Sequence, residues 1–157
     1  MIRSFLIFLA LIPVPAVLCA QDFEVRNGFA FNADGELLDG EYRTLHSDGS
    51  TRIVYNFSEG LQQGPFKAYN ETGTLIESGH FFAGLKHGIW MRWNEQGIKT
   101  GEIAFKYGQR DGKWQIWDEQ GKLRCLMYYH NGSRTGNWQM FNANGELVSE
   151  KTTESVL

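Results

Sequence analysis

Glycine recurs at intervals of 24 residues along this chain of 157, and this regularity restricts the fold more than any other feature of the sequence. Three such rows contain 14 of the 18 glycines. Repetition at a period of about 20–50 residues is typical of proteins built from stacked units, each stabilised mainly by its neighbours. The rows are Gly40, Gly64, Gly88, Gly112 and Gly136; Gly49, Gly73, Gly97, Gly121 and Gly145; and Gly60, Gly84, Gly108 and Gly132.

Large aromatic residues follow the same period. When the first glycine of each unit is counted as offset zero, all five tryptophans fall at offsets 2 and 5. Offset 2 holds Tyr42, Phe66, Trp90, Trp114 and Trp138; offset 5 holds Leu45, Tyr69, Trp93, Trp117 and Phe141; offset 17 holds Phe57, Phe81, Phe105 and Tyr129.

The spacing within each unit predicts a β-hairpin. Offset 6 is Asn or Asp in four of the five units and offset 9 is always glycine, which suits a type I turn closed by a left-handed glycine. Apolar residues then alternate with other residues, as at Leu123, Cys125, Met127 and Tyr129, which is the period of a strand. Segments such as residues 132–136 are expected to form the turn into the next hairpin.

Offsets 2 and 5 have opposite parity, so in a regular strand their side chains point to opposite faces of the sheet. A sheet with aromatic rows on both faces is not packed on a helical layer, although a bulge could aim both rows one way. Equivalent residues lie two strands, or about 10 Å, apart, so we expect them to interleave with Leu75, Ile103 and Leu123 rather than stack directly. The predicted fold is all-β: an elongated single-layer antiparallel sheet of tandem 24-residue β-hairpins.

The repeat also sets the expected boundaries. Five repeats occupy residues 40–148 and start at residues 40, 64, 88, 112 and 136. Residues 21–39 form an N-terminal cap with a partial repeat, because residues 31–37 match residues 141–147. Residues 149–157 lack the aromatic of offset 17 and are expected to fray as a C-terminal tail.

Residues 1–20 have the layout of a secretory signal peptide: a basic start, an apolar run, and a polar residue after Ala20. Cleavage after Ala20 is favoured over lipidation at Cys19, because Leu18 stands where lipidation requires a small residue. We therefore expect an exported protein, periplasmic or associated with the cell envelope.

Residues 81–90 and 107–114 resemble the MORN repeat, and more closely its bacterial variant, which is common in proteins described as antitoxins of toxin–antitoxin systems. The resemblance covers about residues 28–148. It implies an elongated array of hairpins that acts as an interaction module, because MORN repeats are associated with protein contacts and in some cases with membrane lipids. Choline- or glycan-binding repeats are the nearest alternative, although their adjacent aromatic triplet is missing here.

Nothing in the sequence indicates catalysis. The net charge of −3 argues against a nucleic-acid binder, and the four histidines show no metal-ligand spacing. Cys125 lies on the apolar side of its strand, where a buried, inert thiol is expected. No nucleophile elbow, phosphate-binding loop or zinc-protease motif is present. We expect no enzyme activity, no cofactor and no metal site.

Charged and aromatic rows are the candidate interaction surface. Offset 7 carries Glu71, Glu95 and Glu119 at one set of turns, and offset 22 carries Lys86, Arg110 and Arg134 at the opposite set, which predicts one acidic and one basic margin of the sheet. The glycines at offset zero and the tryptophans at offset 2 are expected to be structural. The candidate interaction residues are Tyr69, Trp93, Trp117, Phe141, Lys86, Arg110 and Arg134, and the structural ones are Gly40, Gly64, Gly88, Gly112, Gly136, Trp90, Trp114 and Trp138.

The sequence thus predicts an exported, non-catalytic protein-interaction scaffold of the cell envelope with an unidentified protein partner. A glycan- or lipid-binding envelope module and an antitoxin-like partner of a toxin are the alternatives. Association of copies edge to edge is a further option for a sheet of this kind.

Overall fold

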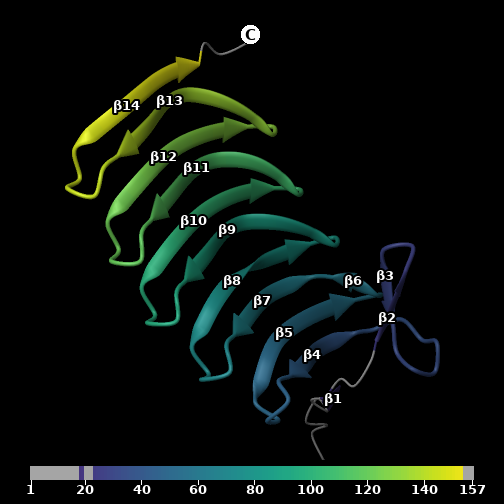
Figure 1. Cartoon of the computed structure of the whole chain (residues 1–157). Helices are drawn as coiled ribbons and strands as arrows, with labels where there is room; N and C mark the ends of the chain where they lie inside the picture. The colour runs from purple at the N-terminus through teal and green to yellow at the C-terminus, as the bar shows by residue number, and fades with distance from the viewer. Residues whose placement is uncertain (1–17, 20–22, 154–157) are drawn as a thin grey trace, which may run out of the picture.

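The computed structural model describes residues 18–19 and 23–153, which form strands and turns without any helix in that part of the chain. Twelve strands make one sheet in the order β1-β4-β5-β7-β8-β9-β10-β11-β12-β13-β14, with β6 paired to β5, and β2 and β3 form a second sheet (Figure 1). All pairs are antiparallel except β1 with β4. The strands are β1 (Leu18–Cys19), β2 (Glu24–Arg26), β3 (Phe29–Phe31), β4 (Gly40–Leu45), β5 (Thr51–Ser58), β6 (Leu61–Gln62), β7 (Gly64–Tyr69), β8 (Leu75–Phe82), β9 (Leu85–Trp93), β10 (Lys99–Lys106), β11 (Gln109–Trp117), β12 (Leu123–His130), β13 (Ser133–Phe141) and β14 (Leu147–Thr153).

This architecture is the predicted one: a single large sheet of hairpins. Its strands are curved, and they follow one another along the array as one layer (Figure 1). The predicted signal peptide lies outside the described residues, apart from β1, which runs beside Tyr42 and Arg43 of β4.

The turn at the tip of each hairpin has the geometry that the Asx-to-glycine spacing predicts. In the second repeat, the amide of Gly73 donates to the carbonyl of Asn70 at 3.0 Å, and Gly73 has a φ of +80°. The side-chain oxygen of Asn70 accepts from the amides of Thr72 and Thr74 at 3.1 and 2.9 Å. The side chain therefore fixes the turn from inside, in the manner of an Asx-turn.

The turn between hairpins is shorter than the sequence indicated. Ala83 and Gly84 have φ angles of +48° and +78°, which is a two-residue type I′ turn. The amide of Gly84 also donates to the carbonyl of Gln62 at 2.8 Å, and the equivalent Gly108 donates to Lys86 at the same distance. These linking turns are therefore hydrogen-bonded from one repeat to the next.

The glycine at offset zero lies inside a strand and not in the linking turn, which corrects the expectation for residues 132–136 and their equivalents. Strand β9 pairs with β8 at His87–His80, and pairing resumes only at Met91–Ser78. Three residues of β9, beginning with Gly88 at a φ of +72°, therefore face a single residue of β8. This bulge bends the strand and increases its local twist.

Each bulge carries the offset-2 tryptophan back over the preceding strand. The indole of Trp90 donates to the carbonyl of His80 at 3.2 Å, and that of Trp114 to Ala104 at 3.0 Å. The Trp90 ring lies directly on Gly79, where a Cβ atom would come within 2.3 Å of it. Trp90 is consequently only 1% exposed and is the largest fully buried side chain in the described part of the chain.

The resulting row of rings on this face, here called the inner face, is continuous. Phe66 contacts Trp90 directly with ring centroids 5.2 Å apart, so the expectation that equivalent aromatics cannot stack was wrong at this pair. The flat-sheet spacing failed because the bulge tilts the indole across the bare backbone of β8. Phe81 and Phe105 of offset 17 fill the remaining gaps, with centroids 5.0 and 6.4 Å from Trp90. Ile103 interleaves as predicted, because it packs in the same buried cluster.

Different contacts close the two ends of the array: buried side chains near the N-terminal end and strand pairing near the C-terminal end. Near the N-terminal end, Ala30 and Leu38 are buried against Tyr42 and Phe57, and the Ala30 amide donates to the Gly60 carbonyl at 2.8 Å. Near the C-terminal end, residues 149–153 do not fray as expected. They belong to β14, which pairs with β13 along its whole length, so backbone pairing completes the fifth hairpin without an aromatic at offset 17.

The cations of offset 22 lie beside the linking turns, but their side chains do not project as a basic margin. Lys86, Arg110 and Arg134 lie over the rings of the next tryptophans, at 3.6, 4.7 and 4.8 Å from the ring centroids. Lys86 also forms an ion pair with Glu77 at 3.3 Å. The cations cover the inner row, and the attraction of a charge to an indole face explains their position.

The contact between Trp90 and Gly79 provides a test of the inner row. Gly79→Ala should lower the free energy of unfolding by about 1–3 kcal/mol, because the added methyl group displaces the buried indole. Gly101→Ala is the matched control: neither glycine has a positive φ, and a Cβ atom at Gly101 meets nothing closer than 3.5 Å. Urea denaturation of both variants checks this, and equal stabilities would contradict the packing described.

The cations provide a second test. Reversing Lys86, Arg110 and Arg134 together to Glu should lower the free energy of unfolding by about 1–3 kcal/mol in total, since each contact with a ring contributes about 0.5–1 kcal/mol. The control reverses Lys67, Lys106 and Lys113, which form no ion pair or ring contact within residues 23–153. Thermal melts of both triple variants check this. If the control variant loses as much stability as the test variant, the loss comes from the change in net charge and not from the ring contacts.

Candidate interaction surface

The offset-5 row lies on the opposite face of the sheet, here called the outer face, as the parity argument predicted. Tyr69 pairs with Leu75 across the hairpin, and Trp117 pairs with Leu123, in each case beside a bulge in the register. Tyr69, Trp93, Trp117 and Phe141 are all half-buried, so the row is neither fully open nor packed away.

One cation is shared between neighbouring repeats on this face. The ammonium group of Lys99 lies 4.4 Å from the centroid of the Trp117 ring and 2.7 Å from the carboxylate of Glu102. Lys86, Arg110 and Arg134, by contrast, belong to the inner face. The structure therefore does not bring the seven candidate interaction residues together on one surface.

The acidic residues of offset 7 lie at the tip turns and are exposed. The amide group of Asn94 donates to the side chain of Glu119 at 2.9 Å and to its backbone carbonyl at 3.1 Å. Glu119 therefore also ties two consecutive tip turns together, whereas no such bond is formed by Glu71 or Glu95 within the described residues.

A groove of about 540 Å³ opens on the outer face over β4, β5 and β7. Beneath it β5 pairs with β7 at Ile53–Ala68 and Val54–Lys67 and with β6 at Phe57–Gln62 and Ser58–Leu61, so the ladder is interrupted between these two pairs of contacts. Pro65 has no amide hydrogen for the ladder. The side chain of Asn56 takes over part of the connection by donating to the carbonyl of Pro65 at 2.9 Å.

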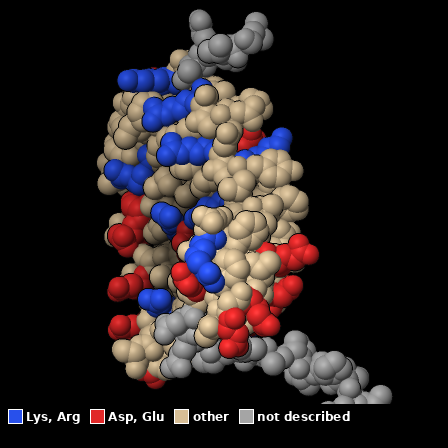
Figure 2. Space-filling view, turned by 90° about the vertical axis from the view of Figure 1, so that its right-hand side faces the viewer, with Lys and Arg blue, Asp and Glu red and all other residues tan. Residues whose placement is uncertain are grey.

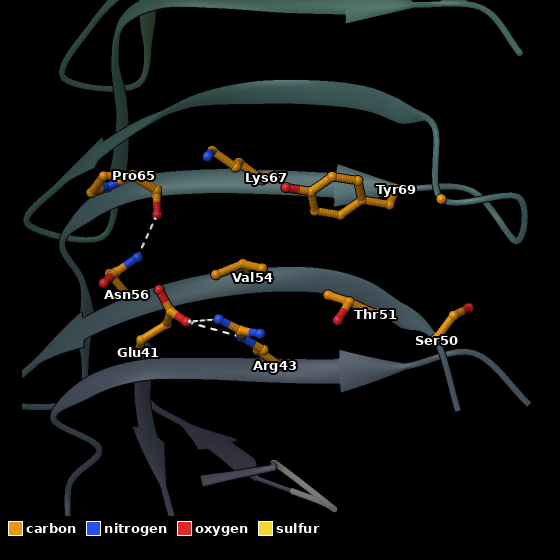
Figure 3. Close-up of a pocket in the computed structure, with 10 residues that line it drawn as sticks. Glu41, Arg43, Ser50, Thr51, Val54, Asn56, Pro65, Lys67 and Tyr69 are labelled. Atoms are coloured by element: carbon orange, nitrogen blue, oxygen red, sulfur yellow. Dashed lines mark hydrogen bonds and ion pairs between the residues drawn. The ribbon is translucent and has the colours of Figure 1, made fainter. Parts of the chain in front are cut away.

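Charged and polar side chains surround an apolar floor at Val54 (Figure 3). Arg43 donates through Nε and Nη2 to one carboxylate oxygen of Glu41, at 2.9 and 2.7 Å. Tyr69 lies along β7 with its hydroxyl directed toward Lys67 (Figure 3).

Ser50 at one end of this groove is held by Asp48. The Ser50 hydroxyl donates to the Asp48 carboxylate at 2.7 Å, and the Ser50 amide does so at 2.9 Å. The hydroxyl bond is the main reason why the pKa of Asp48 lies below its usual value, followed by the amide bond. On the inner face, burial raises the pKa of the Tyr55 hydroxyl.

Charge is distributed unevenly along the array. Residues 23–82 contain nine acidic and four basic residues, whereas residues 83–134 contain nine basic and five acidic ones. In Figure 2 the basic side chains gather toward the later repeats, at the top, and the acidic ones toward the earlier repeats. The earlier and later repeats of the array therefore differ in electrostatic potential.

The His, Cys, Asp and Glu side chains of the described residues were compared with the arrangement that a metal centre requires. Within residues 18–19 and 23–153, no group of three His, Cys, Asp or Glu side chains is placed to hold a metal ion. His46 contacts the backbone carbonyl of Tyr69 at 3.0 Å, and half-buried Cys125 accepts from the indole of Trp138 at 3.1 Å. The same part of the chain has no helix long and apolar enough to cross a membrane.

Sequence reasoning missed the groove because it followed the residues that repeat. The residues that depart from the repeat could have indicated the groove. Pro65 is the single proline after residue 20, and offset 3 is basic only at Arg43 and Lys67. A repeat array needs the same residue types in every unit, so a departure shared by two adjacent units marks a local feature.

Comparisons with known proteins agree with the repeat. The family model described as MORN repeat variant matches residues 110–132 and 134–154. No curated protein matches the chain. A solved structure described as "Crystal structure of GtfA/B complex bound to UDP and GlcNAc" is 16% identical over 84% of this chain, with a TM-score of 0.29. The match covers only 24% of that chain and at this score carries no argument about this protein.

The two matched segments coincide with the hairpins β11–β12 and β13–β14. The preceding hairpins have the same glycines, the same two kinds of turn and the same inner aromatic row. The chain therefore contains MORN repeat variant sequences in its last two hairpins, and the preceding hairpins repeat their pattern.

Proposed function

We propose that this protein is an exported, non-catalytic scaffold of the cell envelope that binds a protein partner along the outer face of its sheet. MORN repeats generally take part in protein or membrane interactions. The observation that carries the proposal is the half-exposed aromatic row at Tyr69, Trp93, Trp117 and Phe141, which remains accessible while the inner row is packed.

The geometry of this row favours an extended partner surface. Successive members lie two strands apart, or about 10 Å, so four members extend over about 30 Å. Half-buried Trp and Tyr side chains provide large contact areas at little entropic cost and are enriched among residues that dominate binding energy. The acidic and basic ends of the array would then orient the partner and speed its association.

Export is supported by the signal-like residues 1–20 and by the composition of the remaining chain. That remainder contains a single cysteine, Cys125, so an oxidising compartment would impose no internal disulfide. Stability would come from strand pairing and the inner row alone.

The row can be tested with a double variant. Trp93→Ala with Trp117→Ala should reduce capture of the partner from an envelope extract about tenfold or more, because truncating central aromatic residues typically costs at least 2 kcal/mol of binding free energy. Quantitative pull-down with the tagged protein measures this. The matched control is Leu85→Ala with Tyr107→Ala, which removes apolar surface that is 46% and 53% exposed near the linking turns.

Capture by the control variant should stay within about twofold of the parent. Equal capture by both variants would contradict binding through the outer row. Retention of the parent on liposomes or on a glycan array, with no protein captured, would favour a lipid- or glycan-binding module instead.

A further inference from the structure

The groove over β4, β5 and β7 is lined by residues that the repeat does not require. At offset 3, Arg43 and Lys67 occupy positions that are Met91, Gln115 and Gln139 in the other repeats. The fold tolerates uncharged residues there. The two cations of the groove are therefore not explained by hairpin formation.

The groove has one cation in excess. Arg43 is paired with Glu41 at 2.7 Å, and both side chains remain about 40% exposed, at 41% and 38%. Lys67 forms no ion pair with any residue in the described ranges, and it flanks the apolar floor at Val54. The charge of the site thus matches a ligand unit that places one negative charge beside Lys67.

The remaining lining favours a ring-shaped, hydroxyl-rich ligand. Tyr69 offers an aromatic face beside Lys67, and the hydroxyl of Thr51 and the amide oxygen of Asn56 offer polar contacts (Figure 3). The volume of about 540 Å³ lies within the range of about 300–1,000 Å³ that is typical of small-molecule sites. An apolar body with a few placed polar groups is the common design of such sites.

Two other ligand classes fit less well. A peptide that adds a strand would bind at a sheet edge and not on the face where this groove lies, and β5 and β7, which carry most of its lining, are each paired on both sides. A phosphate group is usually held by several cations or by clustered backbone amides. In this groove Arg43 is already hydrogen-bonded to the carboxylate of Glu41, which leaves Lys67 as the one cation for a phosphate.

We propose that this groove binds an acidic saccharide, with Lys67 pairing with the sugar carboxylate, Tyr69 stacking on the sugar ring, and Arg43, Glu41 and Asn56 contacting its hydroxyl groups. This site goes beyond the proposed scaffold function. It would attach the array to an acidic glycan while the row at Trp93 and Trp117 binds protein.

Isothermal titration calorimetry with tetragalacturonic acid tests the proposal on protein purified from expression of the full chain. The fully methyl-esterified tetrasaccharide is the matched ligand, because it keeps the rings and loses the charge. We expect the acid to bind at least about tenfold more tightly than the ester, with affinity falling as salt is raised. Lys67→Ala should weaken binding of the acid by a similar factor, while Lys113→Ala, an equal change of charge on the same face, should leave it unchanged.

Three further variants test the stacking contact at Tyr69, which also belongs to the outer row, and the independence of this site from Trp93 and Trp117. Tyr69→Phe should retain binding of the acid and Tyr69→Leu should lose most of it, because stacking requires the ring. Trp93→Ala with Trp117→Ala should leave saccharide binding unchanged, so the two proposals can fail independently. Circular dichroism confirms that each variant is folded.

The proposal is overturned if the acid and the ester bind equally, if neither binds at millimolar concentration, or if Lys67→Ala behaves like Lys113→Ala. Binding of a tetraglutamate peptide or of inorganic phosphate as tightly as the acidic tetrasaccharide would also overturn it, because the groove would then select charge and not a sugar.

Discussion

The contact of an indole ring with the strand before it is the interaction on which this structure depends. A one-layer sheet has no second sheet or helix to bury its faces, so it needs a core made from its own side chains. Trp90 provides it by crossing Gly79 and reaching Phe66, while its indole nitrogen donates to the carbonyl of His80. Equivalent contacts at Trp114 extend the row to Tyr129.

Because the core lies on the inner face, the side chains of the outer face are free to contact other molecules. The offset-2 and offset-5 rings point to opposite faces because their positions have opposite parity, although register shifts interrupt the ladders on both sides of β11. The inner row is covered by cations, whereas the outer row is left half-exposed. The tryptophans predicted to be structural thus lie on one face and the four aromatic interaction candidates on the other, while the three candidate cations lie with the structural tryptophans.

Much of the fold could be predicted from the sequence, because glycine spacing and parity report directly on turns and faces. The tip turns at Asn70 and Gly73 and the separation of the two rows follow from those rules alone. The bulge at Gly88 could not be predicted, since a glycine in a strand and one in a turn look alike in a single sequence. Without the bulge, neither the contact of Phe66 with Trp90 nor the position of Lys86 over the indole could be foreseen.

The candidate sites could also be predicted only in part from the sequence. Tyr69 and Trp117 were identifiable as an outer row from their offset. The groove depends on how β4, β5 and β7 lie side by side and on the side chain of Asn56 donating to the carbonyl of Pro65, and these features appear only when the strands are placed in space. In a repeat protein, residues that obey the repeat describe the fold, and residues that break it point to local function.

The central claim is that each hairpin is stabilised by its neighbours through the inner row. Native-state hydrogen exchange, followed by NMR for individual amides, tests this most directly. The account predicts slowest exchange in β8, β9 and β10 around the Trp90 contacts, with protection falling gradually toward β14, as in a one-dimensional array. Equal protection of all strands, lost in a single step, would contradict it and would indicate one cooperative core.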